Sequence, residues 1–124
     1  MKIILTESQY EKLFNELPTF LKRRITLEDL QYFDEEVKRV TRFTSLSKKF
    51  EDYLSMVIGD IIHEFVIEEK YDEIKTERDP VYGRVFNRDS LNQVMDIYWN
   101  IIPILEKRYR DYLYDVWKTK MSMK

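Results

Sequence analysis

The stretch SLSKKFEDYLSMVIGDIIHEFVIEEKY, residues 45–71, is the longest periodic and the most apolar segment of the chain. Its apolar residues recur at steps of three and four, which is the spacing of one face of an α-helix. The apolar stripe is wide, because Val57/Ile58 and Ile61/Ile62 are pairs of adjacent apolar residues. A wide stripe is typical of a helix that packs on two or more neighbours. We therefore predict a central helix here, around which the rest of the chain packs.

An acidic ridge runs along this central helix and just beyond it, formed by Asp60, Glu64, Glu68 and Asp72. These residues follow one another at intervals of four, where like charges on a helix repel weakly. The helix therefore gains no stability from the ridge. Two interpretations stay open: a solvated face or pairing with a basic helix of the same chain, and a docking surface for a basic partner.

Metal chemistry finds little support, because His63 is the only histidine and the chain has no cysteine. A zinc-protease helix needs a second histidine four residues after the first, and Ile67 stands there. Asp60 and His63 have the spacing of half a di-iron site, whose other half needs a second histidine. We predict no metal and no cofactor, and interpret His63 as a hydrogen-bonded interior residue.

The composition of this 124-residue chain is typical of one helical domain, residues 1–124. Two glycines and three prolines favour long helices with few tight turns. The formal charge of −2 gives no general attraction to nucleic acid or to anionic lipid. The apolar runs are too short for a signal peptide or a membrane span, so we expect an intracellular protein without a membrane partner.

Capping patterns predict where the helices begin. Thr6 with Gln9 and Ser90 with Gln93 form capping boxes, Thr26 opens a helix to about residue 42, and Ser45 or Ser47 caps the central helix. Pro18 ends the first helix near residue 16. Gly59 inside the central helix suggests close helix packing. Pro103 predicts a kink or break near residues 100–102 of the last helix.

The expected fold class is all-α, a bundle of four to five helices. Residues 2–5 and 81–86 are β-type runs that could pair as a minor two-stranded element. Residues 69–79 could continue the central helix or form a loop. The predicted core consists of the apolar residues at helical spacing: Leu13, Phe14, Leu30, Phe33, Val37, Leu54, Ile58, Ile61, Ile62, Phe65, Val94, Tyr98, Ile102, Leu105 and Leu113.

The C-terminal segment interleaves bases with aromatic residues and is the strongest candidate for an interaction surface. It contains Lys107, Arg108, Tyr109, Arg110, Tyr112, Tyr114, Trp117 and Lys118. Such a face can anchor a protein partner, bind nucleic acid by stacking and charge, or pack internally with its bases on the acidic ridge. If it is an interface, Ser in place of Tyr112 and Trp117 weakens a complex and leaves the fold intact. Residues 22–24 form a second, weaker basic patch.

The opening MKIILTESQYEKLF, residues 1–14, resembles the start of many small, mostly uncharacterised proteins of tailed bacteriophages. In those proteins a short basic-apolar run leads into LTESQ and then into a helix. The family includes virion components and early proteins. The resemblance therefore implies a phage-encoded protein in the cytoplasm of a bacterial host or in the virion, and it assigns no functional residue.

Three classes of function follow. The first is a non-enzymatic protein–protein interaction or structural accessory protein, which binds a protein partner or itself as a homo-oligomer. The alternative is a small nucleic-acid-binding regulator that uses the C-terminal basic-aromatic helix or residues 22–24. Acid pairs such as Asp34/Glu35 or Asp60/Glu64 could do acid–base chemistry. Nothing distinguishes them from surface carboxylates, so we predict that the protein is not an enzyme.

Overall fold

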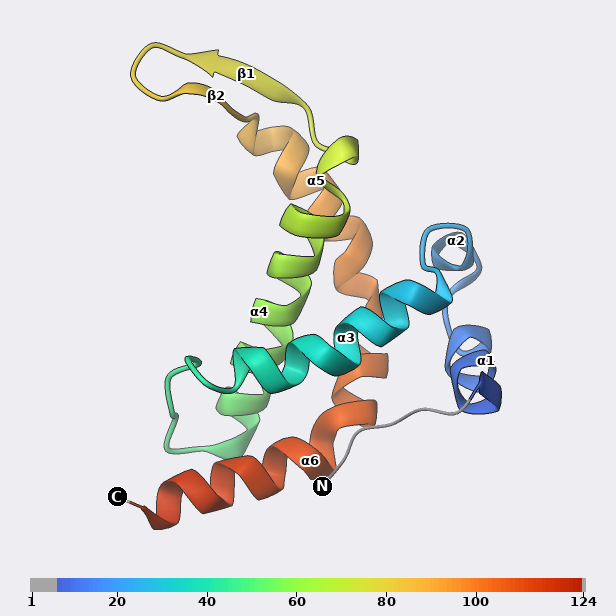
Figure 1. Cartoon of the computed structure of the whole chain (residues 1–124), viewed down its shortest axis with the longest axis vertical. Helices are drawn as coiled ribbons and strands as arrows, with labels where there is room; N and C mark the ends of the chain where they lie inside the picture. The colour runs from blue at the N-terminus through green and yellow to red at the C-terminus, as the bar shows by residue number, and fades with distance from the viewer. Residues whose placement is uncertain (1–6, 124) are drawn as a thin grey trace.

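A computed structural model shows a mostly helical fold with one small antiparallel sheet, which confirms the predicted fold class (Figure 1). The structure describes residues 7–123, and the side chains from residue 11 onward. The helical elements are α1 (Glu7–Asn15), α2 (Thr19–Lys22), α3 (Leu27–Val40), α4 (Phe50–Glu69), the 3₁₀ turn η1 (Tyr71–Glu73), α5 (Arg88–Tyr98), the 3₁₀ turn η2 (Trp99–Ile101) and α6 (Ile102–Ser122). The strands are β1 (Thr76–Asp79) and β2 (Gly83–Phe86).

The central helix α4 contacts α3, α5 and α6, as the wide apolar stripe predicts. Phe33, Phe65 and Tyr98 join three of these helices, with ring centroids 4.7 Å and 5.4 Å apart in successive pairs. The predicted core is buried apart from two residues, Phe14 and Ile102, which are only half-buried. Near the second of these, Ile101 in η2 takes the fully buried position instead. The break between α5 and α6 turns the helix there and changes which isoleucine faces the core.

The predicted cap of the central helix is wrong. The helix begins at Phe50, and Lys49 stands at its N-cap without a side-chain hydrogen bond. The main chain before it is held from outside instead: the Trp117 indole donates to the Ser47 carbonyl over 2.9 Å. A tertiary contact therefore replaces the local cap.

The other helix boundaries follow their local signals more closely. Thr26 and Asp29 form a reciprocal capping box at the start of α3. The predicted break near residue 100 is confirmed by η2, with Pro103 in the first turn of α6, where a proline costs no hydrogen bond. Close packing at Gly59 is not needed, because an added Cβ would lie 3.9 Å from the Trp99 ring, an ordinary contact. The Thr6 cap lies outside the described residues.

The small sheet pairs different segments from those predicted. β1 pairs with β2 in antiparallel register, with Thr76 opposite Phe86 and Asp79 opposite Gly83. Residues 2–5, the predicted partner, lie outside the described residues. The open question about residues 69–79 is answered by η1 followed by β1, so the helix ends at Glu69. The result is a β-hairpin that projects from the helical body (Figure 1).

Candidate interaction surfaces

The centre of the predicted C-terminal surface lies inside the molecule. Tyr109 is 1% exposed, and its hydroxyl donates to the buried carboxylate of Asp34 on α3. Arg108 approaches the same carboxylate with a 3.9 Å ion pair. Including Tyr109 in an exposed aromatic face was therefore wrong, because one face of α6 packs against α3 and α4 and this residue falls on that face.

Two further bases of the segment approach carboxylates of the same chain. The Arg110 guanidinium contacts both oxygens of Glu51 on α4 over 2.5 Å and 3.3 Å. This bond lowers the pKa of the Glu51 carboxyl and raises the pKa of the Arg110 guanidinium, although both side chains are exposed. The exposed Lys107 lies 4.0 Å from Glu16. The bases of α6 thus meet Glu16, just after α1, and acids of α3 and α4, and none of these ion pairs involves the acidic ridge.

The aromatic residues at the end of α6 form a partly buried cluster. Trp117 lies 5.9 Å from the Phe50 ring and 5.9 Å from the Tyr114 ring, measured between centroids. Trp117 and Tyr112 are half-buried, and Tyr114 is 43% exposed. Lys118 lies over the Tyr114 ring at 5.4 Å. The segment is therefore largely packed within the chain, but the expected pairing of its bases with the acidic ridge was wrong. Of its predicted interaction residues, the side chains that remain exposed are Lys107, Arg110, Tyr114 and Lys118.

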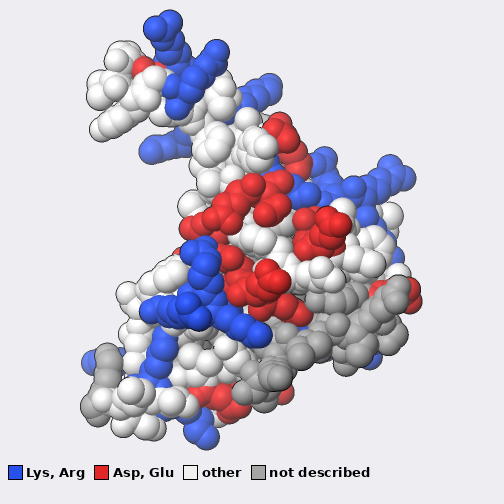
Figure 2. Space-filling view, viewed as in Figure 1, with Lys and Arg blue, Asp and Glu red and all other residues white. Residues whose placement is uncertain are grey.

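The acidic ridge is a real surface feature. Acidic side chains gather across the middle of the face shown in Figure 2, below the projecting hairpin. Asp60, Glu68 and Asp72 are exposed, and Glu64 is half-buried. Arg39 lies 3.6 Å from Glu64, and it is the one cation within ion-pair distance of the ridge among the described residues.

Two hydroxyls on neighbouring elements also contact the ridge. Thr44 donates to Asp60 over 3.0 Å, and Tyr32 donates to Glu68 over 2.9 Å. Burial, the bond to Glu68 and the nearby acids together raise the pKa of the Tyr32 hydroxyl far above its ordinary value. These neutral contacts leave most of the negative charge of the ridge uncompensated.

His63 is exposed on α4, so its interpretation as an interior residue was wrong. It falls on the solvent side of the apolar stripe, between the ridge residues Asp60 and Glu64. Within the described residues, no three His, Cys, Asp or Glu side chains lie close enough to hold a metal ion. No helix in that part of the chain has the length and apolar content needed to cross a bilayer.

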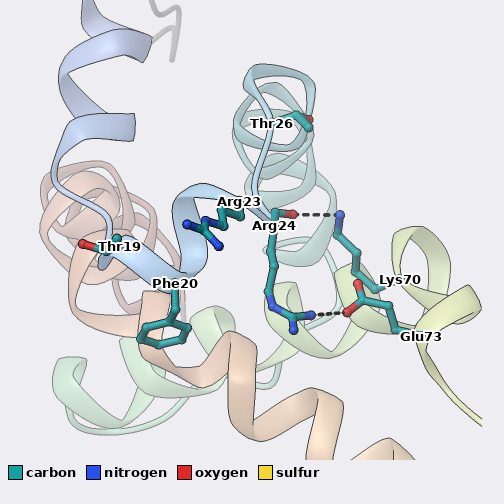
Figure 3. Close-up of a pocket in the computed structure, with 7 residues that line it drawn as sticks. All are labelled: Thr19, Phe20, Arg23, Arg24, Thr26, Lys70 and Glu73. Carbon is teal, nitrogen blue, oxygen red and sulfur yellow. Dashed lines mark hydrogen bonds and ion pairs between the residues drawn. The ribbon is translucent and has the colours of Figure 1, made fainter.

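The second basic patch, residues 22–24, borders an open cleft of about 960 Å³ between α2 and the end of α4 (Figure 3). Arg24 forms a 2.7 Å ion pair with Glu73, and Lys70 donates to the Arg24 carbonyl over 3.0 Å. Glu73 also accepts a 2.7 Å bond from the buried Tyr98. These contacts hold η1, and with it the start of the hairpin, against the helical body.

The base of the hairpin is held by a second set of bonds. The backbone amide of Lys75 donates to the Ser90 hydroxyl over 2.7 Å, and the Asn87 amide donates to the Lys75 carbonyl over 2.8 Å. The Asn87 side chain accepts from the Ser90 amide over 2.9 Å and so caps α5. The predicted cap at Ser90 was wrong, because its hydroxyl is used by the hairpin. Ile74 is buried beside this junction.

The tip of the hairpin presents two apolar side chains to solvent. Val81 is 79% exposed and Tyr82 is 81% exposed. One carboxylate oxygen of Asp79 accepts from both of their amides, over 2.8 Å and 2.9 Å. Gly83 closes the three-residue loop with a φ of +77°, a conformation that suits glycine. The tip is therefore an ordered turn that holds apolar residues in water.

The sequence prediction missed this site. The segment from residue 80 to residue 83, PVYG, does carry the proline and glycine of a turn. That signal could have identified a hairpin, but β1 reads TERD and lacks the alternation of a strand with one buried face. Comparison with protein-family models, with curated proteins and with solved structures gives no match. The surfaces are therefore interpreted from their own geometry.

Proposed function

We propose that this chain is a non-enzymatic interaction protein that docks on a partner through the β1–β2 hairpin. The observation that carries the proposal is the ordered apolar tip, with Val81 and Tyr82 about four-fifths exposed at the end of a projecting element. Binding that covers exposed apolar residues lowers the free energy of the complex. Tyrosine is among the residues that dominate interface energies.

The interactions within the hairpin do not by themselves explain why it is ordered. A lone two-stranded hairpin is marginally stable in water, and both strands here are largely exposed. The bonds at Ser90, Asn87 and Glu73 nevertheless hold its base in one position. A turn that is already fixed loses less conformational entropy when it binds, which favours a docking role.

The resemblance of residues 1–14 to phage proteins supports a phage-encoded accessory or virion component as the setting. This assignment, like the absence of catalysis, stays a prediction.

Site-specific photo-crosslinking tests the docking role. A benzophenone amino acid replaces Tyr82 in one protein and Met123, which is equally exposed at 81%, in a control. Irradiation in the host lysate is expected to give a discrete adduct from position 82 and none from position 123. Excess unlabelled protein should compete for an adduct with a foreign protein, and the Val81→Ser/Tyr82→Ser variant should not. Absence of an adduct at position 82, or equal labelling at both positions, would contradict the proposal.

A second candidate function is nucleic-acid binding, and the hairpin rather than α6 now favours it. Arg78 lies directly opposite Arg84 across the ribbon, and Arg88 follows at its base. Opposed arginines beside an exposed tyrosine could contact phosphates and a base. This candidate predicts oligonucleotide affinity that falls steeply with salt. Fluorescence anisotropy with single- and double-stranded oligonucleotides at low salt tests it, and flat anisotropy would exclude it.

A further inference from the structure

We propose that the partner of the hairpin is a second copy of this chain, and that the hairpin docks on the acidic ridge of that copy. The inference rests on the proposed docking function and goes one step further, because it names the surface that receives the hairpin. It follows from two surfaces of opposite charge, each largely uncompensated by the residues that the structure describes.

The hairpin carries cations without partners. Arg78 and Arg84 occupy opposite register positions, so their side chains lie on the same face of the ribbon, where like charges destabilise the pairing. Among the described residues, no carboxylate oxygen lies within 4.0 Å of the guanidinium nitrogens of Arg78, Arg84 or Arg88.

The acids of the hairpin do not neutralise these arginines. The carboxylate of Asp79 accepts the two amides of the tip, and the carboxylate of Glu77 accepts the Asn87 side chain over 3.0 Å. The basic face of the ribbon is therefore available to an external anion.

The acidic ridge is uncompensated in the same way. It occupies the C-terminal half of α4, where negative charge opposes the helix dipole, and the last turn of α4 has no basic residue. Arg39, the one cation among the described residues within ion-pair distance of the ridge, also forms an ion pair with Glu36. Asp72 forms no ion pair or hydrogen bond within the described residues. An external cation would therefore relieve repulsion along the ridge.

The two surfaces do not meet within one molecule. The hairpin points away from the helical body (Figure 1), and the ridge lies below it on the face seen in Figure 2. A second copy supplies both surfaces at once, so a twofold arrangement can use each of them twice. The hairpin is small compared with the roughly 1,200–2,000 Å² that stable interfaces bury. We therefore expect a weak pair that depends on charge.

Light scattering coupled to size-exclusion chromatography tests the inference. The wild-type protein is expected to approach twice its 15.3 kDa mass at low salt as its concentration rises. It should return to the monomer mass when the salt is raised from about 0.01 M to about 1 M, which shortens the Debye length from about 30 Å to about 3 Å.

Charge reversal identifies the surfaces. We call the β1–β2 hairpin the arm. The arm variant Arg78→Glu/Arg84→Glu and the ridge variant Glu68→Lys/Asp72→Lys should each be monomeric at low salt. An equimolar mixture of the two should form a heterodimer. In it, the native arm of the ridge variant meets the native ridge of the arm variant, and the reversed arm meets the two introduced lysines. The control Glu28→Lys/Glu35→Lys makes the same charge change as the ridge variant on exposed positions of α3 and should dimerise like the wild type. Circular dichroism verifies that each variant is folded.

The outcomes separate this inference from the proposed function. A wild-type monomer under all conditions, or an arm variant with unchanged mass, overturns pairing between copies. If position 82 then crosslinks to a foreign protein, docking through the hairpin survives with a different partner. If it gives no adduct, both proposals fail. Salt-dependent oligonucleotide binding that the arm variant loses, without dimer formation, assigns the arm to nucleic acid and overturns the inference.

Discussion

Asp79 connects the charge of one side chain to the shape of the hairpin tip. Its carboxylate accepts the amides of Tyr82 and Val81, and these bonds lower its pKa below the ordinary value. A carboxyl group with a depressed pKa contributes stability that is present above its unfolded pKa, about 3.9 for aspartate. That contribution is lost as the pH falls through the lower pKa of the folded tip.

We therefore expect the tip to loosen in acid before the helices unfold. The amide chemical shifts of Val81 and Tyr82, followed by NMR between neutral pH and strong acid, should move together below the ordinary aspartate pKa. The Asp79→Asn variant keeps an acceptor oxygen without a titrating group, so its tip amides should not move in that range. Equal titration in both proteins would contradict this role of Asp79.

Tyr109 and Asp34 form a buried polar contact between α6 and α3. Tyr109→Phe removes the hydroxyl and leaves the carboxylate short of one donor. Because hydrogen bonds to charged groups contribute roughly 1.5–3 kcal/mol, we expect a loss of about 2 kcal/mol in the free energy of unfolding. Urea unfolding measures it. The same change at the exposed Tyr114 should stay within about 0.5 kcal/mol, and similar losses at both positions would refute the assignment.

Among the elements, the hairpin depends on its junction with α5. Ser90→Ala removes the acceptor of the Lys75 amide at a site that is 7% exposed. We expect a stability loss of about 1 kcal/mol, together with faster hydrogen exchange of the Lys75 amide. Ser55→Ala on the exposed face of α4 is the control, and it should not change that exchange rate. Unchanged exchange in Ser90→Ala would show that the hydroxyl does not hold the hairpin.

Helix α6 is attached at its far end through Trp117. The indole donates to the Ser47 carbonyl and packs on Phe50, so Trp117→Ser removes a hydrogen bond and a half-buried ring. We expect a loss of about 2 kcal/mol, below the roughly 3–5 kcal/mol of a fully buried tryptophan. Thermal unfolding measures it, with the exposed Lys118→Ser as control. An unchanged melting temperature in Trp117→Ser would mean that Trp117 does not stabilise the fold and would favour its role in an interaction surface.

The whole molecule consists of a packed helical body and a projecting arm. The body buries the rings and aliphatic residues of its helical segments, whereas the arm contributes only the buried Ile74 and the partly buried Phe86. The double variant Val81→Ser/Tyr82→Ser should therefore leave the free energy of unfolding within about 0.5 kcal/mol of wild type. Urea unfolding beside the crosslinking experiment tests this, and a large loss would place the tip in the core of the fold.

Much of the body could be predicted because its signals are local. The period of three and four in α3, α4 and α6 identified their buried faces, and Pro103 located the break before α6. The candidate site was predicted less well. Charge and aromatic content along α6 do not say which residues face inward. Tyr112 follows Tyr109 by three residues, which leaves the two side chains about 60° apart around the helix, and Tyr109 is buried whereas Tyr112 is half-buried. The hairpin was missed because β1 is largely exposed and carries no apolar alternation, so the β-type run 81–86 was expected to pair with residues 2–5 instead.

Helical periodicity and charge spacing are properties of nearby residues, so the sequence alone predicts a helical protein with a central apolar helix and an acidic ridge. Tertiary structure alone decided which charges remain uncompensated. Arg108 and Arg110 contact acids that are distant in the sequence, whereas Arg78 and Arg84 lie opposite each other across a ribbon, without acid partners among residues 11–123. Ion pairing depends on separations of a few ångströms, and those separations are set only when the helices pack and the hairpin leaves the body.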